Sequence, residues 1–118
     1  MDPDLVLADW AGRRITVEID RPLGTRHPRE DDMVYPVNYG FVPGTLAPDG
    51  HPMDVYVLDG SEPLERCEAT VIAIVRRRDD VEDKLVAVLD PGFAWDSAAI
   101  TTAVDFQERY FDSWIELP

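Results

Sequence analysis

Residues 35–54 read Tyr-Pro-Val-Asn-Tyr-Gly-Phe-Val-Pro-Gly-Thr-Leu-Ala-Pro-Asp-Gly-His-Pro-Met-Asp. The Gly-His-Pro turn near its end excludes a helix there, because proline lacks a backbone N–H and glycine favours turns. The stretch sets Asp49 and Asp54 around this turn and leads two tyrosines and Asn38 toward it. It therefore predicts a stiff segment that holds side chains for chemistry, and the alternative is a simple connection between strands.

The segments on either side of this stretch predict a mostly β structure. Alternating or β-branched runs indicate strands, and the two long runs separated by a short acidic turn predict a hairpin. The expected elements are strands over 15–19, 54–59, 67–78 and 84–89, a helix over 98–111 capped by Asp96 or Ser97, and a short strand over 114–117. Several strands with one late helix indicate a mainly β or α+β domain, although periodicity alone does not decide how the sheet closes.

Length and composition limit the classes of protein. A chain of 118 residues predicts a single domain over 1–118, and 45% hydrophobic residues exclude disorder. The longest apolar run, 71–75, is too short to cross a bilayer, and no signal peptide is recognisable, so we expect no membrane partner. Cys67 is the one cysteine, which agrees with a reducing, cytoplasmic location.

The net charge is −13, with a pI near 4.3. This charge disfavours nucleic acid, and we expect no nucleic-acid partner, because binding a polyanion draws on Lys and Arg. The charge also predicts that any anionic substrate needs metal ions and a local basic patch. Carboxylates that converge without cations repel one another by roughly 4 kcal/mol per pair at 4 Å and an effective dielectric of 20.

Three blocks in this order resemble the soluble family I inorganic pyrophosphatases: Tyr-Pro-Val-Asn-Tyr-Gly, Asp-Gly-x-Pro-x-Asp-Val, and an acidic turn leading into Lys-Leu-Val-Ala-Val. The similarity runs from about Thr16 to about Tyr110. The resemblance implies a five-stranded OB-like barrel with one C-terminal helix, hydrolysis of pyrophosphate with Mg²⁺ or Mn²⁺, and assembly as a homo-oligomer.

The sequence departs from the family pattern at four places. His51 stands where longer members have the middle aspartate of Asp-Gly-Asp-Pro-x-Asp, and the pair Tyr110-Phe111 replaces Tyr-Lys. Only eight residues separate Arg26 from Tyr35, so the hairpin of longer members is nearly absent. The acidic turn from Asp79 to Lys84 is also two residues shorter than usual. These changes are typical of a short, divergent branch.

Carboxylates around the turn are the expected metal ligands, because Mg²⁺ takes oxygen ligands and keeps several waters. Asp49 and Asp54 fit that need, and the resemblance adds Asp79 from the acidic turn. The next carboxylate is Asp83 or Glu82. The alternative for the whole acidic turn is a solvated hairpin tip.

Phosphoryl transfer needs groups that stabilise charge on the phosphate oxygens. The candidates for substrate binding are Arg26, Tyr39, Lys84 and Tyr110, with Arg29 as the alternative to Arg26. The resemblance gives Glu18 a supporting place on the first strand. The run Arg76-Arg77-Arg78 is expected as a solvated strand end, since neighbouring strand residues point to opposite faces.

His51 and Asp54 are the catalytic candidates. The resemblance places His51 where an acidic group takes the proton from the attacking water, and a neutral imidazole can accept a proton. The alternative is that His51 caps the turn and faces solvent. Two further functions stay open: hydrolysis of another small phosphoanhydride or phosphoester, and a catalytically silent relative that binds phosphate ligands.

Overall fold

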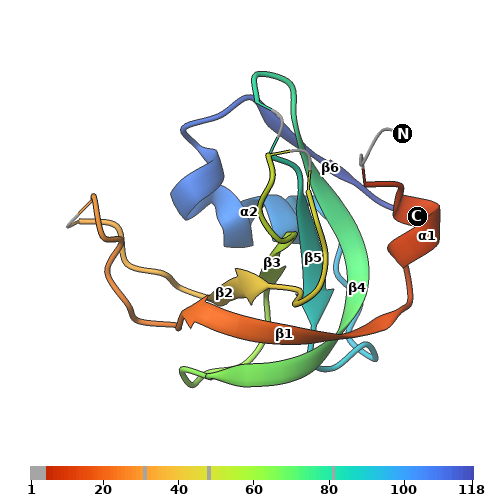
Figure 1. The fold of residues 1–118 in the computed structure, drawn as a ribbon, viewed down its shortest axis with the longest axis horizontal. Helices are drawn as coiled ribbons and strands as arrows, with labels where there is room; N and C mark the ends of the chain where they lie inside the picture. The colour runs from red at the N-terminus through yellow and green to blue at the C-terminus, as the bar shows by residue number, and fades with distance from the viewer. Residues whose placement is uncertain (1–4, 31, 48, 81) are drawn as a thin grey trace.

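The computed structural model describes residues 5–30, 32–47, 49–80 and 82–118. The strands curve around a common axis, with the longer helix packed against the outside (Figure 1). The elements are α1 (Leu7–Trp10), β1 (Arg14–Arg21), β2 (Asn38–Phe41), β3 (Asp54–Val57), β4 (Arg66–Arg77), β5 (Lys84–Val88), α2 (Ser97–Glu108) and β6 (Ser113–Glu116).

The barrel closes because β1 has two neighbours. Its first half pairs with β4, opposing Ile15 to Ala69, and its second half pairs with β2, opposing Ile19 to Gly40. The strand order is β1-β2-β3-β5-β4 and back to β1, with β6 added on β4. The expected five-stranded OB-like barrel with one C-terminal helix is therefore confirmed.

Two hydrophobic cores follow from the alternation of side chains along the strands. Val55 and Val57 of β3, with Leu85 and Ala87 of β5, lie in the barrel core. The intervening residues Tyr56, Val86 and Val88 belong to a second cluster that includes Ile100 and Val104 of α2. Because β5 is covered on both faces, all five of its residues are buried.

Several predicted elements are confirmed, and others differ. The first strand, the strand that begins at Asp54, the hairpin of β4 with β5 and the terminal strand are present. Asp96 caps α2, since its Oδ1 accepts a hydrogen bond from Ala99 N at 2.8 Å. The helix ends at Glu108 rather than at Phe111, so the predicted end was wrong. Strand β2 and the short α1 were not predicted.

Part of the 35–54 stretch is strand, where it passes very close to β1. A Cβ atom added to Gly40 would overlap the carbonyl oxygen of Glu18, so this position excludes any other residue without a backbone shift. Asn38 is buried and fastens loops: its Oδ1 accepts from the backbone N–H groups of Leu23 and Leu64 at 3.0 Å each. Asn38 therefore has a structural role, because its buried side chain joins two loops to β2. The sequence suggests instead a position on the approach to the Gly-His-Pro turn.

Among the described residues, no helix has the length and apolar character that crossing a bilayer requires.

Candidate active site

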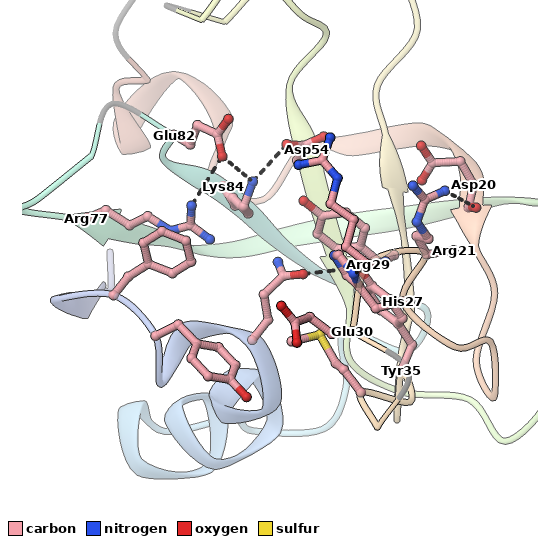
Figure 2. A pocket seen from close by; sticks show the side chains of 15 residues that line it. Asp20, Arg21, His27, Arg29, Glu30, Tyr35, Asp54, Arg77, Glu82 and Lys84 are labelled. Carbon is pink, nitrogen blue, oxygen red and sulfur yellow. Dashed lines mark hydrogen bonds and ion pairs between the residues drawn. The ribbon is translucent and has the colours of Figure 1, made fainter.

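A cavity of about 530 Å³ opens on the outer face of the barrel, beside the end of α2 (Figure 2). Cationic, acidic and aromatic side chains from distant parts of the chain share its walls. The lining residues are Asp20, Arg21, His27, Arg29, Glu30, Met33, Tyr35, Tyr39, Asp54, Arg77, Glu82, Lys84, Gln107, Tyr110 and Phe111.

Strand geometry explains why the polar residues lie together. In β3 and β5 every second side chain enters the barrel core, so Asp54 and Lys84 point to the other face. These strands are parallel neighbours, and their register opposes Val55 to Leu85. Asp54 and Lys84 are the first residues of the two strands, and the register therefore brings them side by side.

Lys84 forms a short ion pair in the cavity wall. Its Nζ lies 2.8 Å from Asp54 Oδ2, and its side chain is only 3% exposed against 31% for Asp54. The ring of Tyr39 lies 5.6 Å from the same nitrogen, a cation–π contact. Burial raises the pKa of Tyr39 well above its usual value, and the charge of Asp54 adds to the effect, so the Tyr39 hydroxyl stays protonated.

Arg77 was expected at a solvated strand end, and this expectation is wrong. The alternation of β4 places Arg77 on the same face as Val75, and its side chain is 1% exposed. Its Nε and NH2 donate to the carboxylate of Glu108 at 2.9 and 2.7 Å, a bidentate pair. Phe111 covers the guanidinium, with the ring centroid 3.6 Å from Cζ.

Buried hydroxyl and amide groups continue this contact beneath the cavity. Tyr56 OH donates to Glu108 Oε2 at 2.6 Å, and Gln107 Nε2 donates to Tyr56 OH at 2.7 Å. Burial by itself would raise the pKa of Glu108, but hydrogen bonds from Arg77, Ser113 and Tyr56 hold that pKa below its usual value. Glu108 is therefore a carboxylate that fixes the last turn of α2 to the barrel.

A second hollow of about 380 Å³ adjoins the cavity and is mainly acidic. It shares Asp20, Asp54 and Glu82 with the cavity, and Asp49 and His51 complete its polar lining. Burial raises the pKa of Asp20, and the Asp54 carboxylate adds to this rise while Arg21 opposes it. The raised pKa of Asp20 therefore reflects mainly its burial, with a smaller part from the neighbouring Asp54 carboxylate.

The donor set of this hollow suits a hard cation, although the donors do not form a cage. Asp20, Asp49, Asp54 and Glu82 offer the oxygen ligands that Mg²⁺ prefers, and Mg²⁺ needs only one or two carboxylates when waters and phosphate oxygens complete its shell. Within the described ranges, no three His, Cys, Asp or Glu side chains are gathered closely enough to hold an ion by themselves.

The structure brings many of the predicted site residues together. Asp49, His51 and Asp54 line the second hollow, and Asp54 also lines the cavity with Tyr39, Lys84 and Tyr110. His51 is exposed, and its backbone N–H donates to Asp49 Oδ1 at 3.0 Å. Tyr110 is 63% exposed at the rim, because it lies beyond the end of α2.

Other predicted residues lie elsewhere. Arg26 is exposed and pairs with Val34 in an isolated β-bridge, whereas Arg29 lines the cavity. Glu18 forms an ion pair with Arg66 at 3.3 Å on the outside of the barrel. None of Arg26, Glu18, Asp79 and Asp83 lines either hollow.

The acidic turn separates its carboxylates. Asp79 is exposed, and Asp83 accepts from Arg76 NH1 at 2.9 Å and from the backbone N–H of Arg77 at 3.0 Å. Glu82 faces the other way and lines both hollows. Of the two carboxylates between which the sequence left the choice open, the structure therefore places Glu82 at the site.

Sequence reasoning did not select Asp20, Arg21 or Arg77. Alternation could have found Asp20, since Ile15, Val17 and Ile19 face the barrel core and the residue that follows must face the other side. Alternation along β4 likewise places Arg77 on the same face as the buried Val75. The register of β1 against β2 shifts between Ile19 and Arg21, and no periodic pattern reveals such a β-bulge.

The fold and the site together define a class: a small OB-like barrel whose outer face carries a pocket lined by both cationic and acidic side chains and joined to an acidic hollow. This arrangement is suited to multiply charged anions and hard cations. The family model for inorganic pyrophosphatase matches residues 11–114. The chain belongs to the inorganic pyrophosphatase family.

Individual relatives agree with this assignment. The inorganic pyrophosphatase of Aeropyrum pernix is 43% identical over 86 residues, which cover 66% of this chain and 46% of the relative. The soluble inorganic pyrophosphatase of Oryza sativa subsp. indica is 32% identical over 110 residues, covering 91% of this chain and 47% of the relative. The chain thus spans about half the length of these relatives.

Solved structures support the fold. The inorganic pyrophosphatase of Ehrlichia chaffeensis superposes with a TM-score of 0.70 at 18% identity, covering 99% of this chain and 91% of that one. The inorganic pyrophosphatase of Neisseria gonorrhoeae superposes with a TM-score of 0.57 at 26% identity, covering 93% of this chain and 78% of that one.

Proposed function

We propose that this chain hydrolyses inorganic pyrophosphate to phosphate in a reaction that depends on Mg²⁺ or Mn²⁺. One observation carries the proposal: buried Lys84 stands 2.8 Å from Asp54 at the point where a cavity with several cationic side chains meets an acidic hollow. A diphosphate needs cations around its oxygens, and a hard cation needs carboxylates, so this junction suits both. Membership of the family supports the same substrate.

Each side chain at the junction has a defined task in this proposal. Lys84, Arg29 and the protonated hydroxyl of Tyr39 would bind phosphate oxygens, with Tyr110 at the open rim. Asp54, Asp49 and Glu82 would hold the metal from the acidic hollow. A bound Mg²⁺ or Mn²⁺ supplies a water of lowered pKa and neutralises charge on the diphosphate.

His51 is proposed as the group that accepts the proton from the attacking water. It lines the acidic hollow together with Asp49 and Asp54, and its exposed position leaves the imidazole in exchange with solvent. A neutral imidazole can accept a proton, but it brings no negative charge to the metal. We therefore expect weaker support by Mg²⁺ than by Mn²⁺, Co²⁺ or Zn²⁺, for which imidazole is a better ligand.

Phosphate release from pyrophosphate, measured across Mg²⁺, Mn²⁺, Co²⁺ and Zn²⁺, tests the proposal. We expect metal-dependent release that Asp54→Asn abolishes. Hydrolysis of other small phosphoanhydrides or phosphoesters with no release from pyrophosphate would replace the proposed substrate. No release from any of them, together with retained phosphate binding, would identify a silent relative.

Two further proposals accompany the activity. We propose a homo-oligomer, which light scattering coupled to size-exclusion chromatography would test. A cytoplasmic location is proposed from the single cysteine, Cys67, which has no intrachain partner for a disulfide.

A further inference from the structure

One carboxylate in the cavity lies between two buried cations. Glu82 Oε2 is 3.2 Å from Arg77 NH1 and 3.8 Å from Lys84 Nζ, and Figure 2 shows the carboxylate reaching toward both. The Arg77 and Lys84 side chains are 1% and 3% exposed, whereas that of Glu82 is 40% exposed. Arg77 and Lys84 are thus buried in the cavity wall, whereas Glu82, the anion between them, is partly exposed to solvent.

Their other partners fix both cations in direction. Glu108 holds Nε and NH2 of Arg77, and Phe111 covers the guanidinium plane, so NH1 is the nitrogen directed toward the turn. NH1 also lies 3.6 Å from Asp80 Oδ2. Asp54 holds Lys84 from the other side at 2.8 Å. Two donors with little freedom therefore converge near one point, which a carboxylate oxygen occupies.

We propose that this point is an oxyanion site for a phosphate group and that Glu82 fills it when no ligand is bound. A phosphate oxygen accepts the same charge-assisted hydrogen bonds from guanidinium and ammonium groups as a carboxylate oxygen does. Phosphate binding would displace Glu82 toward the acidic hollow, which Glu82 also lines. The relevance of this site to catalysis rests on the proposed function, but the site itself binds phosphate without metal.

The proposal makes Glu82 a competitor of phosphate. Removal of its charge weakens the competing contact with both donors, which keep Asp80 and Asp54 as partners, and removes repulsion between the carboxylate and the entering anion. Glu82→Gln should therefore bind phosphate more tightly than the wild-type protein. If Glu82 merely lines the pocket, the two affinities should be nearly equal, because no internal anion would then have to leave.

The first experiment titrates inorganic phosphate into metal-free protein by calorimetry, in the presence of a chelator. We expect the affinity of Glu82→Gln to exceed that of wild type by roughly tenfold, about one charge-assisted contact. Asp112→Asn is the matched control, since it removes one negative charge from an exposed surface pair with Arg78. Its affinity should stay within about twofold of wild type, as for an exposed ion pair. Equal affinities for Glu82→Gln and wild type overturn the proposal.

The second experiment removes the Arg77 donor. Arg77→Met alone leaves Glu108 buried without a counter-charge, which could unfold the protein, so it is combined with Glu108→Gln. The double variant is compared with Glu108→Gln alone, and circular dichroism confirms that both fold. We expect the double variant to lose metal-free phosphate binding and Glu108→Gln to retain it. Equal binding by the two overturns the role of Arg77, and if the double variant does not fold, the Glu82→Gln titration still decides.

These measurements separate the site from the activity. Metal-free binding that responds to Glu82 and Arg77 supports the oxyanion site even if pyrophosphate is not hydrolysed. Hydrolysis of pyrophosphate with phosphate binding that is insensitive to Glu82→Gln leaves the proposed function standing and overturns this inference.

Discussion

The ammonium group of Lys84 lies 2.8 Å from the carboxylate of Asp54, and the two residues begin neighbouring parallel strands. The strand register alone fixes this relationship, because it opposes the residues that follow, Leu85 and Val55. A buried ammonium without a partner would be costly, so Asp54 stabilises the strand start, and it also lines the acidic hollow.

Asp54→Asn should remove the thermal response to divalent metal. A metal that binds only the folded state raises the melting temperature, and Asp54 is a proposed ligand that lines both hollows. Without metal, the variant should melt at a lower temperature and lose roughly 1–2 kcal/mol, because Lys84 loses its charged partner. Thermal melts with and without Mg²⁺ or Mn²⁺ measure both effects. Asp105→Asn, which alters an exposed pair with Arg109, is the control, and an equal metal response in all three proteins would remove Asp54 from the site.

Lys84→Met should lower kcat/KM for pyrophosphate by about 100-fold or more, the loss typical of removing a group that stabilises developing charge. The melting temperature should change little, because methionine fills the same buried space and the Asp54 carboxylate, which loses its partner, is partly exposed. Steady-state kinetics and thermal melts on one preparation test this. If Lys84→Met instead loses much stability while its folded fraction keeps the wild-type kcat/KM, the role of Lys84 is structural.

His51→Asp should raise pyrophosphate hydrolysis supported by Mg²⁺ and move the acidic limb of the pH–rate profile to lower pH. A carboxylate adds a negative charge beside Asp49 and Asp54 and loses its proton at lower pH than an imidazole. The turn should survive, because the hydrogen bond from residue 51 to Asp49 comes from the backbone. Profiles with Mg²⁺ and Mn²⁺ that coincide for both proteins would falsify the role of His51.

Gly40→Ala should destabilise the barrel by several kcal/mol. The added methyl group would overlap the carbonyl oxygen of Glu18, and backbone atoms can move apart only by distorting the β1–β2 pairing. Urea unfolding gives the change. Gly92→Ala is the control, since there the nearest neighbour is an exposed side chain, Asp90. Similar midpoints for the two variants would contradict the close approach.

Glu108→Gln should make the free energy of unfolding less dependent on pH in the acidic range. The pKa of Glu108 in the folded protein lies below its ordinary value of 4.5, so its ionised form contributes stability above that value. This contribution is lost as the pH falls through the folded pKa. Wild type should therefore lose free energy of unfolding more steeply than the variant below pH 4.5. Urea unfolding across the acidic range tests the difference, and parallel curves would contradict it.

Local patterns predicted most of the barrel. Alternation identified β1 and β3, and the short acidic turn between two β-branched runs identified the β4–β5 hairpin. Strand β2 was not predicted, because it is four residues long and lies among prolines and a glycine, which are typical of loops. Its strand character comes from pairing with β1 and β3, which no local pattern carries.

The site could be predicted only in part, for a similar reason. The residues near the Gly-His-Pro turn are close in sequence, and their convergence follows from the turn. Arg77 is different, since three consecutive arginines look solvated and its partner Glu108 lies 31 residues further on. The separation of Glu82 from Asp83 likewise depends on Arg76, which binds Asp83.

Closure of the barrel through β1 and β4 also bears on how the chain folds. The paired residues 14–18 and 66–70 are distant in sequence, so the chain must lose loop entropy before their contacts form, and folding should be slow for its size. Until closure, both strands expose unpaired backbone edges that a second copy can meet. Refolding yield should therefore fall as protein concentration rises, even though the finished barrel no longer offers those edges.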